Sequence, residues 1–124
     1  MPRRILIIDD EDDIREVAAL SLETVAGWDV MMAGSGAAGI VKAQEQRPDA
    51  ILLDVMMPGM DGPTTFRELR KNPATSTIPV LFLTAKVQAT DRRRFADLGI
   101  HAVLVKPFDP MTLSTQIANA LGWK

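Results

Sequence analysis

The sequence lacks cysteine altogether and contains a single histidine, His101, among its 124 residues. Disulfide bonds and thiolate metal sites are therefore excluded, and so is a metal centre built from several imidazoles. No apolar run approaches the roughly 20 residues that cross a bilayer. The opening "MPRR" leads directly into a short apolar run, without the pattern of a signal peptide. We therefore expect a cytoplasmic protein that does not associate with membranes.

Neither sign of charge is in large excess, because the formal net charge is only −2 at pH 7. This balance gives no indication of general nucleic-acid affinity, and we expect no direct DNA binding. The length suits one domain with one core. No linker or low-complexity segment interrupts the sequence, so residues 1–124 are predicted to form a single domain with no fused output domain.

Four short apolar runs predict buried parallel strands, because none of them alternates polar with apolar residues. A fifth, more mixed segment suits an edge strand. In chain order, the predicted strands are "ILII" (5–8), "WDVMMA" (28–33), "AILL" (50–53), "PVLFL" (79–83) and "AVLV" (102–105).

The segments between these strands have the spacing of helices. Strands alternating with helices predict an α/β protein of the (βα)5, doubly wound, flavodoxin-like class. Its five-stranded parallel sheet should have the order 2-1-3-4-5, with helices on both faces. The first helix should bury a stripe of Ile14, Val17, Ala18, Ser21, Leu22 and Val25 before Gly27; the others are expected at about 36–46 after an N-cap at Ser35, at 62–71, at 89–98 and at 110–121.

Polar side chains follow the ends of four predicted strands, where the ligand crevice of such a sheet lies. Three of them are carboxylates, which cannot all stay ionised without compensation. Oxygen ligands without sulfur or imidazole indicate Mg²⁺ (or Mn²⁺) as the compensating cation. Asp10 and Asp54 are the candidate ligands, and Asp9 would act mainly through water. The complete set at the strand ends is Asp9, Asp10, Asp54, Thr84 and Lys106.

The same set of residues suits phosphoryl transfer to an aspartate, which is a known form of nucleophilic catalysis. Asp54 ends the central strand and is the natural nucleophile. Lys106 is the ammonium placed to neutralise charge on the phosphoryl oxygens, and the Thr84 hydroxyl can donate a hydrogen bond to one of them.

Four stretches in register, "ILIIDDE", "ILLDVMMPGMDG", "VLFLTA" and "VLVKPF", resemble the receiver domain of two-component response regulators. The resemblance covers nearly the whole chain and implies a signalling switch rather than an enzyme. It implies that Asp54 accepts a phosphoryl group from a histidine kinase or a histidine phosphotransfer protein. It further implies that Mg²⁺ is held by Asp9, Asp10, Asp54 and the Met56 backbone carbonyl. Thr84 is then the switch hydroxyl and Lys106 the phosphate-pairing lysine. The resemblance also implies a cis peptide bond between Lys106 and Pro107.

Three positions beside the site bear on output and on phosphoryl lifetime. Many receivers carry Tyr or Phe three residues before the lysine, where this chain has Val103. Valine cannot repeat the inward rotation of that ring, so the relay through Thr84 is expected to be altered while the phosphate chemistry survives. Met56 and Lys86 stand at positions that, in the family, tune how readily water reaches the phosphoryl group.

The resemblance places the readout on the face of the fourth helix, fifth strand and fifth helix. That face should bind an effector protein, or a second copy of the chain after phosphorylation. A receiver fold used only for docking, with phosphorylation vestigial, stays open because of Val103. A haloacid-dehalogenase-type phosphatase fits less well, since its second Asp is replaced by Met56. A flavodoxin-like FMN module fits poorly, because an acidic first loop repels phosphate.

The rest of the acidic run "DDEDD" (9–13) has mainly structural interpretations. Asp12 and Asp13 stand where the first helix begins, and acids there cap a helix and complement its dipole. Glu11 is interpreted as a peripheral modulator of metal binding. Elsewhere, Trp28 and Trp123 are predicted to be packing anchors rather than ligand platforms.

Overall fold

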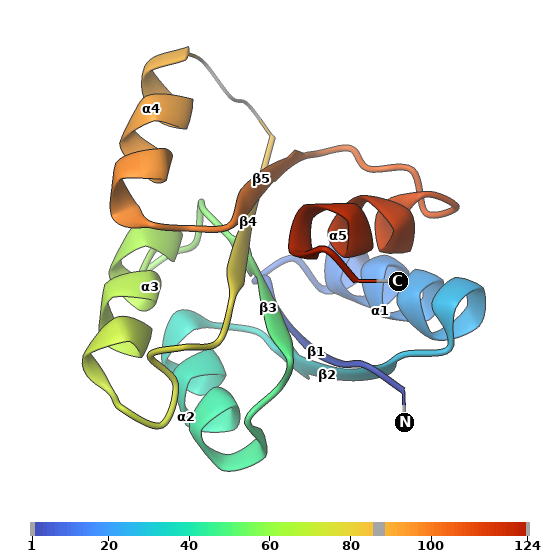
Figure 1. Cartoon of the computed structure of the whole chain (residues 1–124), viewed down its shortest axis with the longest axis horizontal. Helices are drawn as coiled ribbons and strands as arrows, with labels where there is room; N and C mark the ends of the chain where they lie inside the picture. The colour runs from blue at the N-terminus through green and yellow to red at the C-terminus, as the bar shows by residue number, and fades with distance from the viewer. Residues whose placement is uncertain (1, 86–88, 124) are drawn as a thin grey trace.

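The computed structural model describes residues 2–85 and 89–123, whose elements are arranged as Figure 1 shows. Within these residues strands and helices alternate as predicted, and none of the helices is long and apolar enough to cross a membrane. The elements are β1 (Arg4–Ile8), α1 (Asp12–Ala26), β2 (Asp29–Ala33), α2 (Gly36–Gln46), β3 (Ala50–Asp54), α3 (Gly62–Lys71), β4 (Val80–Thr84), α4 (Ala89–Leu98), β5 (Ala102–Val105) and α5 (Leu113–Leu121).

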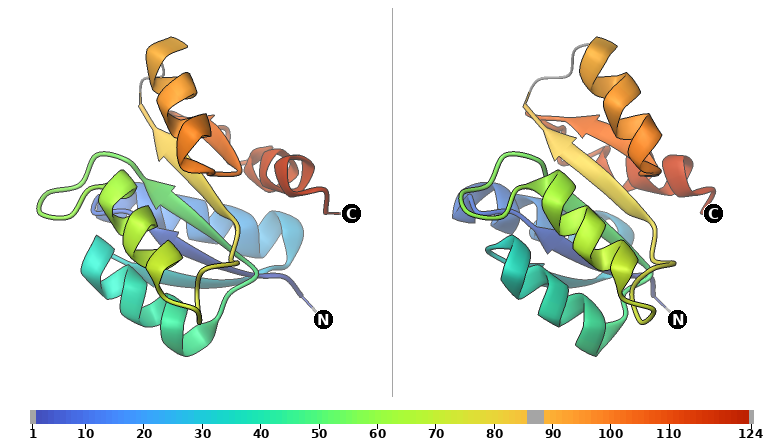
Figure 2. Two further views of the ribbon diagram at one scale, coloured as in Figure 1. Left: turned by 60° about the vertical axis from the view of Figure 1, so that its left-hand side comes forward. Right: turned by 90° about the vertical axis from the view of Figure 1, so that its left-hand side faces the viewer.

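The strands form one parallel sheet in the order β2-β1-β3-β4-β5, which confirms the predicted topology. Ile8 pairs with Leu53, and Leu53 pairs with Phe82, so β1, β3 and β4 end at the same edge of the sheet. Helices α1 and α5 cover one face, while α2, α3 and α4 cover the other (Figures 1 and 2). The carboxyl ends of the strands therefore form a common edge between the two helical layers.

Strand β1 shows why the apolar runs do not alternate with polar residues. Leu6 and Ile8 pack into the core beneath α2, α3 and α4, whereas Ile5 and Ile7 pack into the core beneath α1 and α5. All four side chains are buried. A strand covered on both faces needs apolar residues at every position, as parallel sheets generally do.

The helix boundaries follow local hydrogen bonds that the sequence largely predicts. The Ser35 hydroxyl accepts a hydrogen bond from the Ala38 amide at 3.1 Å, which confirms it as the N-cap of α2. Gly27 ends α1 with φ of 70°, a conformation that costs glycine little. Helix α5 begins at Leu113 rather than near residue 110, because the Asp109 carbonyl accepts hydrogen bonds from both Thr112 and Leu113 in a preceding turn.

The predicted apolar stripe of α1 is wrong in part. Val17 and Val25 are 46% and 44% exposed, whereas Ala19 is buried. Helix α1 packs against both the sheet and α5, so its buried face is centred on small residues that permit close approach. The Ser21 hydroxyl in this face donates a hydrogen bond to the Pro110 carbonyl. The residues of α1 that are buried are Ala18, Ala19, Ser21 and Leu22.

The start of α1 also differs from the prediction. Its N-cap is Glu11, and no side chain caps the helix there. Asp12 and Asp13 lie in the first turn, where their charge complements the helix dipole without a capping hydrogen bond. The two tryptophans do act as packing anchors, because the rings of Trp28 and Trp123 meet edge to face with centroids 5.3 Å apart.

Candidate functional site

The polar residues at the strand ends come together at the carboxyl edge of the sheet. Asp9 directly follows β1, Asp54 is the last residue of β3, and Lys106 directly follows β5. The Lys106 Nζ lies 3.0 Å from Asp9 Oδ2 and 3.4 Å from Asp54 Oδ1. Three separate strands therefore supply one compact cluster of opposite charges, as the positions in the sequence indicate.

Glu11 belongs to this cluster too, although its position in the sequence suggested only a peripheral role. Its Oε1 lies 3.1 Å from Lys106 Nζ. Carboxylate oxygens of Asp9, Glu11 and Asp54 all lie within 4.8 Å of one another, so they could hold a metal ion together. The signal in the sequence is the place of Glu11 one residue after Asp10, in the loop that follows β1.

Asp54 is an acid in an environment that disfavours its charge. It is 2% exposed. Burial, followed by the negative charge of Asp9, raises the pKa of Asp54 from its ordinary 3.8 to about 7, although the ammonium of Lys106 lowers it. The carboxyl group of Asp10 also lies within hydrogen-bonding reach of Asp54 and adds to the rise. Without a cation, this site therefore tends to hold a proton.

Lys106 is the main positive charge that offsets the cluster. Its side chain is 10% exposed. Burial by itself lowers the pKa of Lys106, but the hydrogen bond to Asp9 and the charges of Asp9 and Asp54 outweigh burial and raise the pKa above its usual value. The ammonium is therefore retained at neutral pH, next to the oxygens that would face an incoming phosphoryl group.

The cluster has acceptor capacity that the protein does not use. Asp10 Oδ1 and Asp54 Oδ2 are buried, and neither accepts a hydrogen bond from any residue that the structure describes. Two adjacent carboxylates, both acceptors only, need either a shared proton or a cation between them. An oxygen-only donor set of this kind fits Mg²⁺ or Mn²⁺ and does not favour a soft metal.

The loop after β3 is held tightly against the end of that strand. The Met56 amide donates to Asp54 Oδ1 at 3.4 Å, while Met56 as a whole is 76% exposed. The Gly62 amide donates to the Val55 carbonyl at 2.9 Å. A Cβ on Gly62 would lie only 2.7 Å from the Asp54 carbonyl oxygen, so this close approach requires glycine.

Asp61 caps α3 by accepting a 2.9 Å hydrogen bond from the Thr64 amide, which lowers the pKa of Asp61.

The remaining predicted positions surround this cluster. Thr84 is buried at the end of β4, and its carbonyl accepts a hydrogen bond from the Lys106 amide at 2.8 Å. The Lys106–Pro107 peptide bond is cis, as predicted. Val103 is partly buried and packs against the core beneath α2, α3 and α4. Lys86 lies outside the residues that the structure describes.

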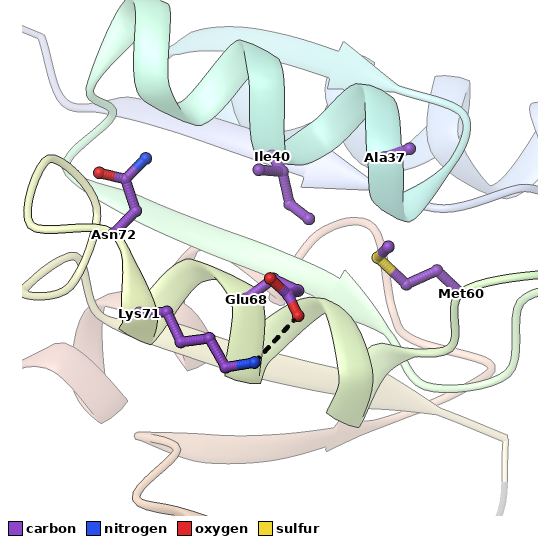
Figure 3. Close-up of a pocket in the computed structure, with 6 residues that line it drawn as sticks. All are labelled: Ala37, Ile40, Met60, Glu68, Lys71 and Asn72. Atoms are coloured by element: carbon purple, nitrogen blue, oxygen red, sulfur yellow. Dashed lines mark hydrogen bonds and ion pairs between the residues drawn. The ribbon is translucent and has the colours of Figure 1, made fainter.

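A separate pocket of about 410 Å³, whose lining includes none of the acidic cluster, lies between α2 and α3 (Figure 3). Ile40 extends from α2 toward α3, and Met60 closes one end. Its two charged residues, Glu68 and Lys71, pair with each other at 3.3 Å and leave no unused charge in its lining. The pocket therefore offers apolar surface but no group that is suited to phosphoryl chemistry.

The parallel sheet, with acids and a lysine at the carboxyl edge of its strands, defines a doubly wound α/β protein whose charged residues gather where such folds bind their ligands. The chain belongs to the response regulator receiver domain family, whose model matches residues 5–118.

Relatives in this family support the assignment. The chain is 45% identical over 88% of its length to the "DNA-binding dual master transcriptional regulator RpaA" of Synechocystis sp., of which the match covers 44%. It is 35% identical over 98% of its length to the "Alkaline phosphatase synthesis transcriptional regulatory protein PhoP" of Bacillus subtilis, of which the match covers 49%. The chain thus spans about half the length of these curated relatives.

Solved structures give the same result. The chemotaxis protein CheY4 of Vibrio cholerae superposes with a TM-score of 0.90 at 31% identity, and the match covers 97% of this chain and 99% of that one. A response regulator from Chloroflexus aurantiacus superposes with a TM-score of 0.88 at 35% identity over 98% of this chain and 99% of that one. Homology therefore establishes the fold of the chain and the place of the chain in two-component phosphorylation signalling.

Proposed function

We propose that Asp54 is the phosphoacceptor of this receiver domain. The observation that carries the proposal is its position: a buried carboxylate at the end of the central strand, with an oxygen 3.4 Å from Lys106 Nζ. The donor is a phosphohistidine of a histidine kinase or of a histidine phosphotransfer protein. An Asp54 oxygen forms a bond to phosphorus, the P–N bond of the donor breaks, and the imidazole leaves with the bonding electrons and takes up a proton.

The neighbouring residues have distinct roles in this reaction. Asp9, Asp10, Asp54 and the Met56 backbone carbonyl are proposed to hold Mg²⁺ (or Mn²⁺), with Glu11 close enough to contribute. A bound divalent ion supplies positive charge that offsets both the carboxylates and the phosphoryl oxygens. The Lys106 ammonium pairs with a phosphoryl oxygen, and the Thr84 hydroxyl donates a hydrogen bond to the phosphorylated group.

Phosphorylation is proposed to act as a switch rather than as a step in the turnover of a substrate. A phosphoryl group on Asp54 adds negative charge opposite Lys106 and competes for its contacts with Asp9 and Glu11. The proposed output face consists of α4, β5 and α5, where Val105 at the end of β5 is exposed. An effector protein or a second copy of the phosphorylated chain binds there.

The partner in the cell is not given by the names of the relatives. RpaA is named as DNA-binding, but the match covers less than half of that protein. With a formal net charge of −2, we propose that these 124 residues contact a protein rather than DNA, in the cytoplasm. Val103 cannot turn inward as an aromatic ring does, so a docking module whose binding is uncoupled from phosphorylation is the second candidate.

Intact-mass spectrometry tests the phosphoacceptor directly. Wild-type protein incubated with Mg²⁺ and acetyl phosphate should gain one phosphoryl group, and Asp54→Asn should gain none. Asp13→Asn is the matched control, because it removes an acid of the same run that lies in the first turn of α1. An unmodified wild type, or equal modification of Asp54→Asn, would overturn the proposal. Effector binding that is equal for wild type and Asp54→Asn would favour the docking module.

A further inference from the structure

Arg15 is a charged residue that reaches the acidic loop from α1 without touching the carboxylates at the centre of the site. Its Nη1 donates a 2.7 Å hydrogen bond to the Asp9 carbonyl oxygen, and its Nη2 lies 2.5 Å from Asp12 Oδ1. The Arg15 side chain is only 17% exposed, although it carries a full charge. One guanidinium therefore joins the backbone after β1 to the first turn of α1.

The hydrogen bonds around Asp9 show what this guanidinium fixes. The Asp9 amide donates to the Ala33 carbonyl at 3.1 Å, and the Asp9 Oδ1 accepts from the Glu11 amide at 2.9 Å. The carbonyl oxygen of Asp9 is held by Arg15. The planar peptide unit between Asp9 and Asp10 is thereby held on its carbonyl side, and its orientation helps to set the direction in which the Asp10 side chain leaves the chain.

The end of β2 is built to admit the guanidinium. A Cβ on Gly34 would lie 3.3 Å from Arg15 Nη1, which is tighter than most real contacts. Glycine at this position therefore leaves room for the arginine between β2 and the acidic loop. Arg15 has a planar fork of donors, which suits it to bind two oxygens in fixed directions, whereas lysine presents a single flexible ammonium.

We propose that Arg15 is a positioning residue for the phosphorylation site: by holding the Asp9 carbonyl it orients Asp10 toward Asp54 and so sets the affinity for the divalent cation. This proposal rests on the function proposed for Asp54. It concerns a contact with the backbone of Asp9 and not with the carboxylate oxygens that would hold the cation, and groups of this kind typically change metal affinity by about 10–100-fold when they are lost.

The direction of the effect distinguishes positioning from simple electrostatics. Arg15 brings positive charge close to an acidic cluster, so by charge alone its removal should strengthen the binding of a cation. Positioning predicts the opposite, because Asp10 is released from its orientation. Arg15→Lys separates the two explanations further, because it keeps the positive charge but loses the planar guanidinium. Electrostatics then predicts unchanged cation binding, whereas positioning predicts weaker binding.

The experiment is a calorimetric titration of the metal-free protein with Mg²⁺, with Arg70→Ala as control. Arg70 is another partly buried arginine that donates to a backbone carbonyl, that of Ile78 at 2.9 Å, in the loop before β4. The Kd for Mg²⁺ should rise by about 10–100-fold in Arg15→Ala, rise less in Arg15→Lys, and stay near the wild-type value in Arg70→Ala. Hydrogen exchange at residues 9–12 should become faster in the Arg15 variants alone.

An unchanged or lower Kd in Arg15→Ala would overturn the proposal. If Arg15→Ala does not fold, Arg15→Lys decides, because a Kd equal to that of wild type contradicts positioning. The outcome is separate from that of the phosphoacceptor test: wild type that is phosphorylated on Asp54, with Arg15 variants that bind Mg²⁺ normally, would refute only the role of Arg15.

Discussion

The ammonium of Lys106 lies 3.0 Å from the carboxylate of Asp9, although one residue follows the first strand and the other follows the last. This contact spans the sheet across β3 and β4 and leaves Asp54 between its two ends in the strand order. Two residues so far apart in the sequence meet only when β1, β3, β4 and β5 are assembled side by side. Their contact therefore links the stability of the fold to the electrostatics of the site.

Replacing Lys106 should destabilise the metal-free protein. Lys106→Ala leaves the buried carboxylates of Asp9 and Asp54 without their cation, and breaking a buried pair on one side typically costs about 3–5 kcal/mol. Urea denaturation at pH 7.5 in the presence of a chelator measures this loss. Lys71→Ala is the control, because its pair with Glu68 is exposed and should contribute at most about 1 kcal/mol. Similar losses in both variants would contradict the assigned role of Lys106.

The metal-free protein should become less stable as the pH rises from about 4 to about 7. The raised pKa of Asp54 means that the folded protein holds a proton there over this range, while the unfolded chain has released it. Because the folded state binds more protons, the free energy of unfolding falls as the pH increases and levels off above about 7. Denaturation curves recorded at a series of pH values in chelator test this expectation.

The variant Asp54→Asn identifies the source of that pH dependence. It removes the titrating group, so its stability should vary less over the same range and exceed that of wild type at pH 8 by a few kcal/mol, since each pKa unit corresponds to about 1.4 kcal/mol. If wild type and Asp54→Asn show the same pH profile, the raised pKa does not belong to Asp54.

The sequence predicted much of the fold because its signals are local or periodic. The runs "ILII" and "AILL" are apolar at every position, which indicates strands buried on both faces, and Ser35 and Gly27 mark helix ends through their own backbone preferences. The exposed positions Val17 and Val25 were missed because helical spacing alone does not say which neighbours a helix has. Helix α1 lies against α5 as well as the sheet. Because of this second contact, the residues that α1 buries are mostly small ones.

The sequence predicted which residues form the site but not all of the contacts between them. Parallel strands bring their carboxyl ends to one edge, so Asp9, Asp54 and Lys106 could be grouped from the sequence. Side chains that reach back from the loop or the helix could not be grouped in this way. The contacts of Glu11 with Lys106, and of Arg15 with the Asp9 carbonyl, depend on rotamers and on the path of the loop.

Binding of Mg²⁺ should stabilise the protein through the acids that face the crevice and not through those that start α1. A ligand at 100 times its Kd adds about 2.7 kcal/mol to the free energy of unfolding. Asp10→Asn should lose most of this gain, because Asp10 faces Asp54, whereas Asp13→Asn should keep it, because Asp13 lies in the first turn of the helix. Thermal unfolding with increasing Mg²⁺ gives the comparison, and equal gains in the two variants would contradict the division of the acidic run.

A side chain at Gly62 should destabilise the loop that carries Met56. In Gly62→Ala the new Cβ would meet the backbone oxygen of Asp54 at 2.7 Å and the Cα of Val55 at 2.8 Å, and backbone atoms at the end of a central strand cannot move away easily. Gly39→Ala is the informative comparison, because its Cβ would meet only the Ile8 side chain, with Cδ1 at 2.4 Å and Cγ1 at 2.7 Å, and a side chain can shift more easily than the backbone at the end of a central strand. Overpacking of this kind costs about 1–3 kcal/mol, and we expect Gly62→Ala at the upper end and Gly39→Ala at the lower.

Gly62→Ala should also slow phosphorylation by acetyl phosphate at saturating Mg²⁺, since any movement that relieves the clash displaces Asp54 itself. A Gly62→Ala protein with wild-type stability and phosphorylation rate would show that the close approach does not constrain the site.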